Sequence, residues 1–216
     1  APGFFIAHAL AEPLGYTADG FSVPYLFALV MILVLYMGIG MFFLAKVLLR
    51  YFPPIPVAIT LFSVFLGTNL FYYSSFEPAM SHAYSFVLFS IFLYLTPLWL
   101  EKPSIGRTIG IGLLAGIIVL VRPTNIIIGL FPLLWGVTSI AMLIQRIQWL
   151  FSKWPMVLLA IAMALLVWVP QLSYWKYITG SWWYYSYGSE SFFWLEPKII
   201  DGLFSYRKGW LVYTPI

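Results

Sequence analysis

The sequence predicts an all-α fold, a polytopic transmembrane helix bundle with about six spans and the start of a seventh. Of its 216 residues, 62% are hydrophobic and only 8% are charged, which is less charge than the surface of a soluble domain of this length needs. The apolar residues gather in long runs without Asp, Glu, Lys or Arg. All but one of these runs exceed the roughly 18 residues that indicate a transmembrane helix.

The predicted spans follow these runs along the chain. They cover residues 23–49, 55–75, 79–100, 106–121, 123–145 and 154–174, and residues 173–209 form a long outer loop. The fourth uncharged run has only 14 residues. A helix of that length covers about 21 Å, less than a hydrocarbon core of about 30 Å, so flanking residues extend it or it ends inside the bundle.

Strands are a poor alternative, because membrane barrels need segments of about ten residues that alternate apolar and polar side chains. The runs here are apolar all round, and we expect one membrane domain over residues 1–216. Both ends of the sequence suggest cuts in a longer protein. The sequence starts at Ala1 without an initiator methionine or the basic region of a signal peptide. At the other end, a new apolar segment is only beginning at Tyr213.

Orientation follows from the basic residues. Three alternate connections each carry two of them, namely Lys46 with Arg50, Lys102 with Arg107, and Arg146 with Lys153. Cytoplasmic loops are enriched in Lys and Arg, which places these three connections in the cytoplasm. The segments 1–24, 72–82, 122–125 and 173–209 then face outward.

Composition and motifs also exclude several classes of function. The net charge of +4 is spread over the loops, whereas nucleic-acid binding needs a clustered basic patch. Cysteine is absent, which excludes disulfides, Cys-ligated zinc and thiol redox chemistry. The chain has no Walker motif, GxGxxG, HExxH or nucleophile elbow.

The first candidate site is Glu77 with His82, where the second span gives way to the third. Charged side chains near a membrane cost free energy, so each one calls for a functional or structural explanation. If Pro78 occupies the first turn of the next helix, His82 lies about one turn along it. Glu77 is then a candidate base or metal ligand beside His82. The alternative is that Glu77 interacts only with the helix dipole and His82 only lies at the interface.

The second candidate group is Arg122 with Asn125, at the end of the short span. An arginine below the headgroups needs an anion such as a lipid phosphate, or it only snorkels to the surface. The third is Arg207 with Lys208, a pair of cations suited to a phosphate or simply solvated in a loop. The aromatic stretch 182–194 is either an interfacial belt or a stacking surface for a sugar or lipid.

Four patches resemble the GT-C superfamily of membrane glycosyltransferases, which use polyprenyl-phosphate sugars. The nearest likeness is to bacterial relatives of the protein O-mannosyltransferase and aminoarabinose transferase branch. The patches are 1–3 with 11–13 (APG and AEP), 77–83 (EPAMSHA), 112–125 (from GLLAG to VRPTN), and 203–215 (LFS and KGWLVYTP). They span almost the whole chain, but each is short. Glu77 stands where the family more often has Asp.

The resemblance implies transfer of a sugar from a polyprenyl-phosphate carrier to an acceptor hydroxyl. The reaction takes place at the outer face of a bacterial inner membrane. The family's principal acid would precede Ala1, Glu77 and His82 are the catalytic candidates within the chain, and both are candidate ligands for a divalent metal. Arg122, Asn125, Arg207 and Lys208 would bind the carrier or its sugar. The implied partners are the lipid-linked sugar and the bilayer, not nucleic acid.

Two other functions stay open. A transporter or flippase for a lipid-linked or small solute predicts charges paired in mid-membrane and repeated halves, while the charges here gather on the outer side and the spans contain almost none. A non-catalytic membrane subunit predicts that Glu77, Arg122 and Lys208 can be replaced without loss of function. The outward grouping favours the enzyme.

Overall fold

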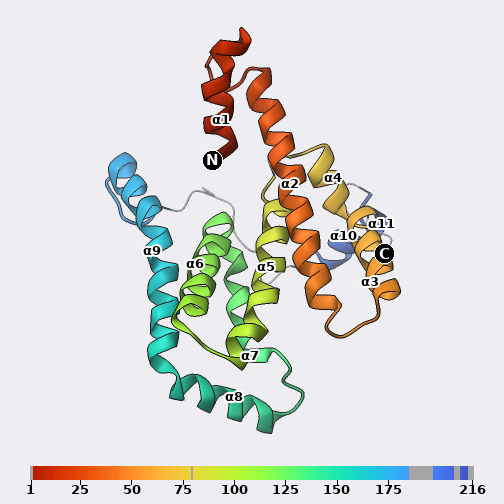
Figure 1. Ribbon diagram of the computed structural model, residues 1–216, viewed down its shortest axis with the longest axis vertical. Coiled ribbons are helices and arrows are strands. Elements are labelled where there is room, and N and C mark those ends of the chain that lie inside the picture. The colour runs from red at the N-terminus through yellow and green to blue at the C-terminus, as the bar shows by residue number, and fades with distance from the viewer. Residues whose placement is uncertain (1, 79, 185–196, 207–209, 214–216) are drawn as a thin grey trace. The chain divides into compact units, whose positions relative to one another are not determined.

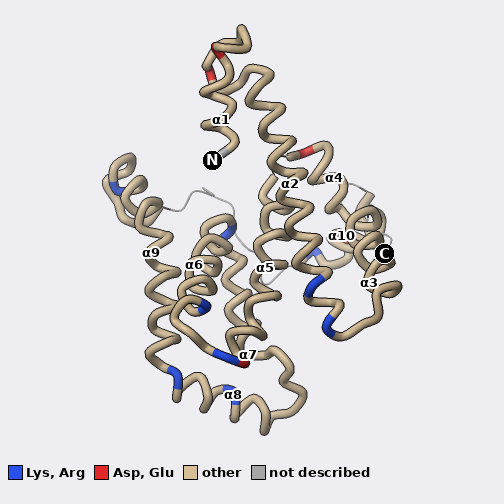
Figure 2. The backbone as a smooth tube through the Cα atoms, viewed as in Figure 1, with Lys and Arg blue, Asp and Glu red and all other residues tan. Residues whose placement is uncertain are grey.

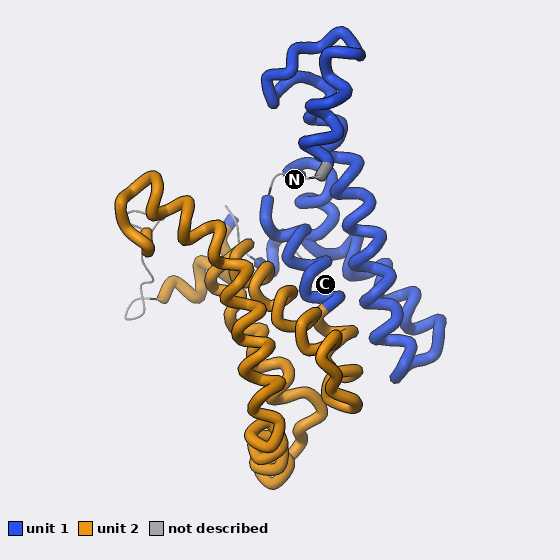
Figure 3. Tube along the Cα trace, turned by 60° about the vertical axis from the view of Figure 1, so that its left-hand side comes forward, with its two compact units in different colours: residues 1–91, 206–216 blue, residues 92–205 orange. Residues whose placement is uncertain are grey.

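The computed structural model describes residues 2–78, 80–184, 197–206 and 210–213, and these residues form helices, turns and loops without any strand. The chain divides into two compact units, residues 1–91 with 206–216 and residues 92–205 (Figure 3). We describe each unit by itself, and the expectation of one domain stays a prediction.

The helices of the described residues follow one another along the chain (Figure 1). Their bounds are α1 Pro2–Ala11, η1 Glu12–Leu14, α2 Val23–Leu48, α3 Pro54–Leu66, α4 Asn69–Ser75, α5 Ser81–Glu101, α6 Ile105–Val121, η2 Pro123–Gly129, α7 Leu130–Leu134, α8 Ile140–Ser152, α9 Trp154–Thr179, α10 Ile199–Phe204 and α11 Trp210–Tyr213. Here η denotes a 3₁₀ helix. The helix α5 contributes its first half to the first unit and its second half to the second unit.

The structure confirms the all-helical class for the described residues, but it does not confirm six spans. Three helices, α2, α5 and α9, are long and apolar enough to cross a membrane. The pair α3 and α4 adds a fourth if the two helices form one span, and they are bent by 59° at their junction. The helix α6 has 17 residues and stays short, as its uncharged run indicated.

The predicted span 123–145 is not one helix. It consists of η2, the five-residue α7, a turn at Gly136 with φ of 69°, and the first half of α8. Pro132 lacks a backbone N–H and disfavours a continuous helix. Ser139 then starts α8, because its hydroxyl accepts a hydrogen bond from the Met142 N–H at 3.3 Å. The prediction followed uncharged runs alone, so it did not use the proline, the glycine turn and the serine cap that divide this run.

The break between α3 and α4 is held by one side chain. The Thr68 hydroxyl donates to the Val64 carbonyl at 2.6 Å and accepts from the Leu70 N–H at 3.2 Å. Thr68 therefore satisfies a carbonyl of the first helix and a donor of the second, which is the requirement for interrupting a helix in an apolar setting.

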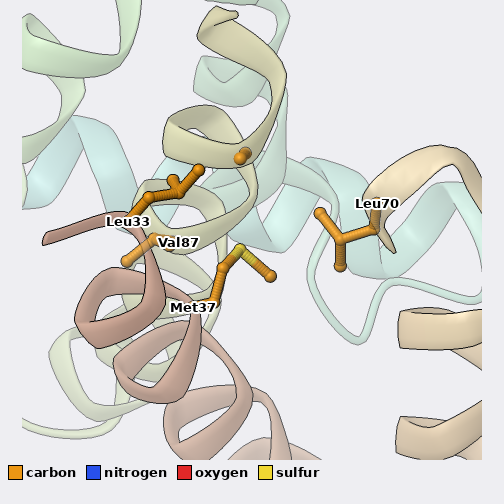
Figure 4. Close-up of a cluster of buried hydrophobic side chains, with 5 residues drawn as sticks. Leu33, Met37, Leu70 and Val87 are labelled. Carbon is orange, nitrogen blue, oxygen red and sulfur yellow. The ribbon is translucent and has the colours of Figure 1, made fainter. Parts of the chain in front are cut away.

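The core of the first unit lies between α2, α4 and α5. Its buried residues are Leu33, Met37, Leu70, Ala83 and Val87 (Figure 4). At Gly40 of α2, an added Cβ would lie 2.9 Å from the Phe86 ring, so the glycine permits the close approach of α5.

The N-terminal segment, expected to be part of an outer loop, instead forms α1 and packs against α2. Ala7, Ala11 and Tyr25 form a buried cluster there. His8 Nδ1 and Tyr25 Oη share a hydrogen bond of 2.6 Å. The ten residues of α1 are too few to span a membrane. The search for long uncharged runs therefore did not predict this helix.

In the second unit, α6 packs against α9 through small residues. Gly112 and Gly116, four residues apart on α6, lie against Ala160 and Ala164 of α9. Small residues at this spacing let two helix backbones approach closely, and association inside a membrane depends on such contacts because lipid is as apolar as the side chains.

The turn from α5 into α6 is fixed by hydrogen bonds. Trp99 Nε1 donates to the buried Thr108 hydroxyl at 2.8 Å. Arg107 Nη1 donates to the carbonyls of Leu98 at 2.6 Å and Lys102 at 2.8 Å. Arg107 thus satisfies carbonyls at the end of α5, where the helix dipole favours a cation.

Candidate functional site

The charges of the first unit separate along α2. Glu12 and Asp19 precede the helix, while Lys46 lies in its last turn and Arg50 follows it. Among the described residues of this unit, Figure 2 shows the acidic positions toward the start of α2 and the basic positions at its end. Glu77 follows α4, so if α3 and α4 together cross a membrane once, Glu77 lies on the side opposite to Arg50.

Asp19 shapes the turn that leads into α2. Its Oδ1 accepts from the backbone N–H groups of Phe21 at 2.8 Å and Ser22 at 2.9 Å, and its Oδ2 accepts from the Thr17 hydroxyl at 2.8 Å. These bonds, led by the one from Phe21, lower the Asp19 pKa from 3.8 to about 2. The residue is fully exposed and its role is to order the turn.

Glu77 lies in the turn between α4 and α5 and is half-buried. The Tyr72 hydroxyl donates to Glu77 Oε1 at 3.1 Å. The Glu77 N–H and the Phe76 N–H both donate to the Tyr72 carbonyl, at 3.3 and 2.9 Å. Tyr72 therefore holds the backbone and one carboxylate oxygen of Glu77. Within the described part of the chain, Oε2 accepts no hydrogen bond from a protein donor.

His82 lies beside Tyr73, the residue that follows Tyr72 in α4. Its ring stacks on the Tyr73 ring with centroids 4.4 Å apart and planes 26° from parallel. The sequence predicted His82 one turn into a helix begun at Pro78, but α5 begins at Ser81, so His82 is its second residue. Pro78 lies before the helix and its carbonyl accepts from the Tyr84 hydroxyl at 3.2 Å.

Tyr72 and Tyr73 were not predicted from the sequence as parts of this site. Consecutive residues of a short helix point to different sides, and here one reaches Glu77 while the other meets His82. The available signal was a Tyr-Tyr pair one turn before an isolated carboxylate at a helix end. We call Tyr72, Tyr73, Glu77 and His82 the Glu77 cluster.

A metal has limited support from these residues. Among the described residues, no group of three or more His, Asp or Glu side chains could hold an ion. Glu77 and His82 would supply two ligands at most, with the remaining positions taken by water or phosphate oxygens, as Mg²⁺ often arranges them.

Arg122 and Asn125 form a second group, which belongs to the second unit. Arg122 ends α6 in an extended conformation, and the Asn125 N–H donates to its carbonyl at 2.9 Å. Asn125 Nδ2 donates to the Ile118 carbonyl at 3.2 Å. Asn125 therefore caps α6, and Arg122 lies where the helix dipole favours a cation.

The structure thus joins Glu77 to His82 through adjacent tyrosines, and Arg122 to Asn125 through the end of α6. Arg207 and Lys208 lie outside the described residues. In the expected outer loop, the residues up to Thr179 continue α9 instead, and Ile199–Phe204 form α10.

Three indoles gather where α9 ends. Trp168 and Trp183 stack with centroids 6.4 Å apart, and Trp175 meets Trp183 edge-on at 5.6 Å. Nearby, Lys176 Nζ donates to the Gly180 carbonyl at 2.6 Å and lies 5.9 Å from the Trp182 ring centroid. Such a cluster is typical of a helix end at a membrane interface.

Comparisons with protein-family models, curated proteins and solved structures find no match for this chain.

Proposed function

We propose that the protein is an integral membrane glycosyltransferase that moves a sugar from a polyprenyl-phosphate carrier to an acceptor hydroxyl at the outer membrane face. The observation that carries the proposal is the Glu77 cluster, in which Tyr72 orients one oxygen of an isolated carboxylate at 3.1 Å. The second oxygen is then available to a hydroxyl group. A positioned base needs this arrangement before it needs any particular pKa.

In the reaction, the acceptor oxygen attacks the anomeric carbon of the sugar. Glu77 takes the hydroxyl proton as the new carbon–oxygen bond forms. The bond between the anomeric carbon and the carrier phosphate breaks, and the phosphate leaves with the electron pair. A cation near the departing phosphate would stabilise its charge.

The orientation in this proposal rests on charge. Lys46 lies in the last turn of the apolar helix α2 and Arg50 follows the helix, while Glu12 and Asp19 precede it. The end that carries Lys and Arg is the cytoplasmic one by the positive-inside rule. Glu77 then faces outward, where lipid-linked sugars of a bacterial inner membrane would meet their acceptors.

The test is sugar transfer by the protein in membranes supplied with radiolabelled polyprenyl-phosphate sugars. Glu77→Gln keeps the shape of the side chain and removes its basicity, and we expect transfer to fall by at least about 100-fold, the lower range for general base catalysis. The matched control is Glu101→Gln, at the other end of α5 and exposed, which should retain activity.

Two outcomes would overturn parts of the proposal. If transfer survives Glu77→Gln at full rate, the protein is a glycosyltransferase but the Glu77 cluster is not its catalytic site. If the unmodified protein transfers no sugar from any carrier while the membranes remain competent for a control transferase, the glycosyltransferase itself is rejected.

The bend between α3 and α4 favours the second candidate function, a transporter or flippase. Transporters bind their solutes at interrupted helices whose freed backbone groups face the site. Thr68, however, satisfies the Val64 carbonyl and the Leu70 N–H at this break, which leaves fewer groups for a solute. Movement of a fluorescent lipid-linked sugar across vesicles without transfer to an acceptor would select this function.

A further inference from the structure

The helix α8 has three distinct sides. Large apolar residues recur at spacings of four, three and four, and so form one stripe along the helix. This stripe consists of Ile140, Ile144, Ile147 and Phe151, all exposed. Gln145, Gln148 and Ser152 form an exposed polar stripe beside it, and the third side carries Leu143, Arg146, Trp149 and Leu150, which are partly buried.

The third side fixes how α8 is rotated in the second unit. Arg146 Nη1 donates to the Pro132 carbonyl at 2.7 Å, and its Nη2 donates to the Trp135 carbonyl at 3.1 Å. The Trp149 ring meets the Trp99 ring edge-on with centroids 5.5 Å apart. These contacts use the inward side of α8, so the apolar stripe is held away from the body of its own unit.

The stripe is too exposed to be left in water without a partner. Ile140 is 78% exposed and Phe151 is 76% exposed, one near each end of the helix. A contiguous apolar surface of this kind marks an interaction site on a protein or a membrane.

The continuation of the chain identifies the partner. Only Lys153 separates the end of α8 from the start of α9. The helix α9 is a candidate membrane span, and none of its apolar window is buried within the protein. Figure 1 shows α8 turned across the start of α9. If α9 crosses the bilayer, the C-terminal end of α8 lies at the surface of that bilayer, because α9 begins there.

Charge agrees with a lipid partner. The chain has no Asp or Glu between Glu101 and Glu190, and Lys153 directly follows α8. A helix with an apolar stripe, a polar side, no acidic residue and a cation at its end is suited to an interface that contains anionic headgroups.

We propose that α8 lies in the plane of the membrane surface, with the stripe Ile140, Ile144, Ile147 and Phe151 among the acyl chains and with Gln145 and Gln148 in water. The partner is the bilayer itself, and Arg146 and Trp149 set the angle at which α8 meets it. This role is separate from sugar transfer, and it rests only on the part of the proposed function that places α9 across the membrane.

The experiment uses the absence of cysteine from the sequence. Single cysteines at Ile144, Ile147, Gln145 and Gln148 are labelled with a nitroxide in the whole protein, reconstituted in phosphatidylcholine–phosphatidylglycerol vesicles. Electron paramagnetic resonance then measures collisions with oxygen, which enters the hydrocarbon, and with a neutral nickel chelate, which stays in water. Probes at Ile144 and Ile147 should favour oxygen several-fold, and probes at Gln145 and Gln148 should favour nickel.

Two reference probes make the result decisive. A nitroxide at Leu143, on the inward side, reports burial in protein, with low access to both reagents. A nitroxide at Leu165, exposed on α9, reports whether α9 is in the bilayer. Nickel access at Ile144 and Ile147 equal to that at the glutamines would overturn the proposal, as would a pattern like that of Leu143, which means that protein covers the stripe.

Discussion

Gly112 of α6 lies so close to Ala160 of α9 that a Cβ at Gly112 would collide with the Ala160 carbonyl oxygen and lie 2.8 Å from Met163 Cβ. Gly112→Ala therefore forces the two helices apart. We expect a loss of about 1–3 kcal/mol in the free energy of unfolding, the usual cost of overpacking. Thermal unfolding of the purified protein in detergent micelles measures it.

The matched control is Gly110→Ala in the same helix. Nothing lies within 4 Å of a Cβ built there. Alanine favours a helix over glycine by about 0.8–1 kcal/mol, so this variant should unfold at the same temperature or higher. Equal unfolding temperatures for the two variants would show that the contact between α6 and α9 does not limit stability.

The contact between α6 and α9 also shows what the sequence could reveal. The glycines were visible as GLLAG, but their partners were not, because residues 157–167 of α9 are all Ala, Val, Leu, Ile or Met and only the packing selects Ala160 and Ala164. Long uncharged runs predicted α2, α5 and α9 well. They failed for residues 123–145, where turn residues break an apolar run that carries no charge to mark the break.

The candidate site could be predicted from the sequence only in part. Glu77 and His82 stood out because charged and titratable residues are rare in this chain. Tyr72 and Tyr73 did not, since tyrosine is common here and its role depends on the turn between α4 and α5. That turn starts α5 at Ser81 rather than at Pro78, a shift of under one turn that no composition rule resolves.

The turn before α2 should respond to acid through Asp19. Its pKa is about 2 in the folded protein, below its value of about 3.9 in an unfolded chain. A lowered pKa stabilises the fold fully above about pH 4, and this contribution is lost as the pH falls through about 2. Carbon-13 NMR of the Asp19 carboxyl should give a midpoint near 2.

Thr17→Val removes one of the hydrogen bonds to Asp19 and keeps the size of the side chain. Because that bond lowers the Asp19 pKa, the NMR midpoint should rise while the two backbone donors still hold it below 3.8. A midpoint at 3.8 in the unchanged protein would mean that the turn is not formed in solution.

Tyr72→Phe should weaken the proposed sugar transfer without removing it. The variant keeps the ring and loses the hydroxyl that donates to Glu77 Oε1 at 3.1 Å. A hydrogen bond to a charged group contributes about 1.5–3 kcal/mol, so we expect a fall in kcat of about tenfold or more, with KM for the carrier little changed. Initial rates with a labelled polyprenyl-phosphate sugar measure both constants.

The control for this variant is Tyr73→Phe, one residue along α4. It also loses a phenol hydroxyl but keeps the ring that stacks on His82, and it should transfer sugar at nearly the normal rate. Equal losses in both variants would point to a general disturbance of α4, and no loss in either would remove Tyr72 from the site.

The proposed orientation predicts opposite labelling at the two ends of α3 and α4. Ser75→Cys, beside Glu77, and Tyr51→Cys, beside Arg50, are both exposed positions in a chain without cysteine. In intact cells, a membrane-impermeant maleimide should label Ser75→Cys and spare Tyr51→Cys, because the basic end faces the cytoplasm. Both should react once the membrane is opened. Labelling of both in intact cells would show that α3 and α4 do not cross the membrane, and labelling of Tyr51→Cys alone would reverse the orientation.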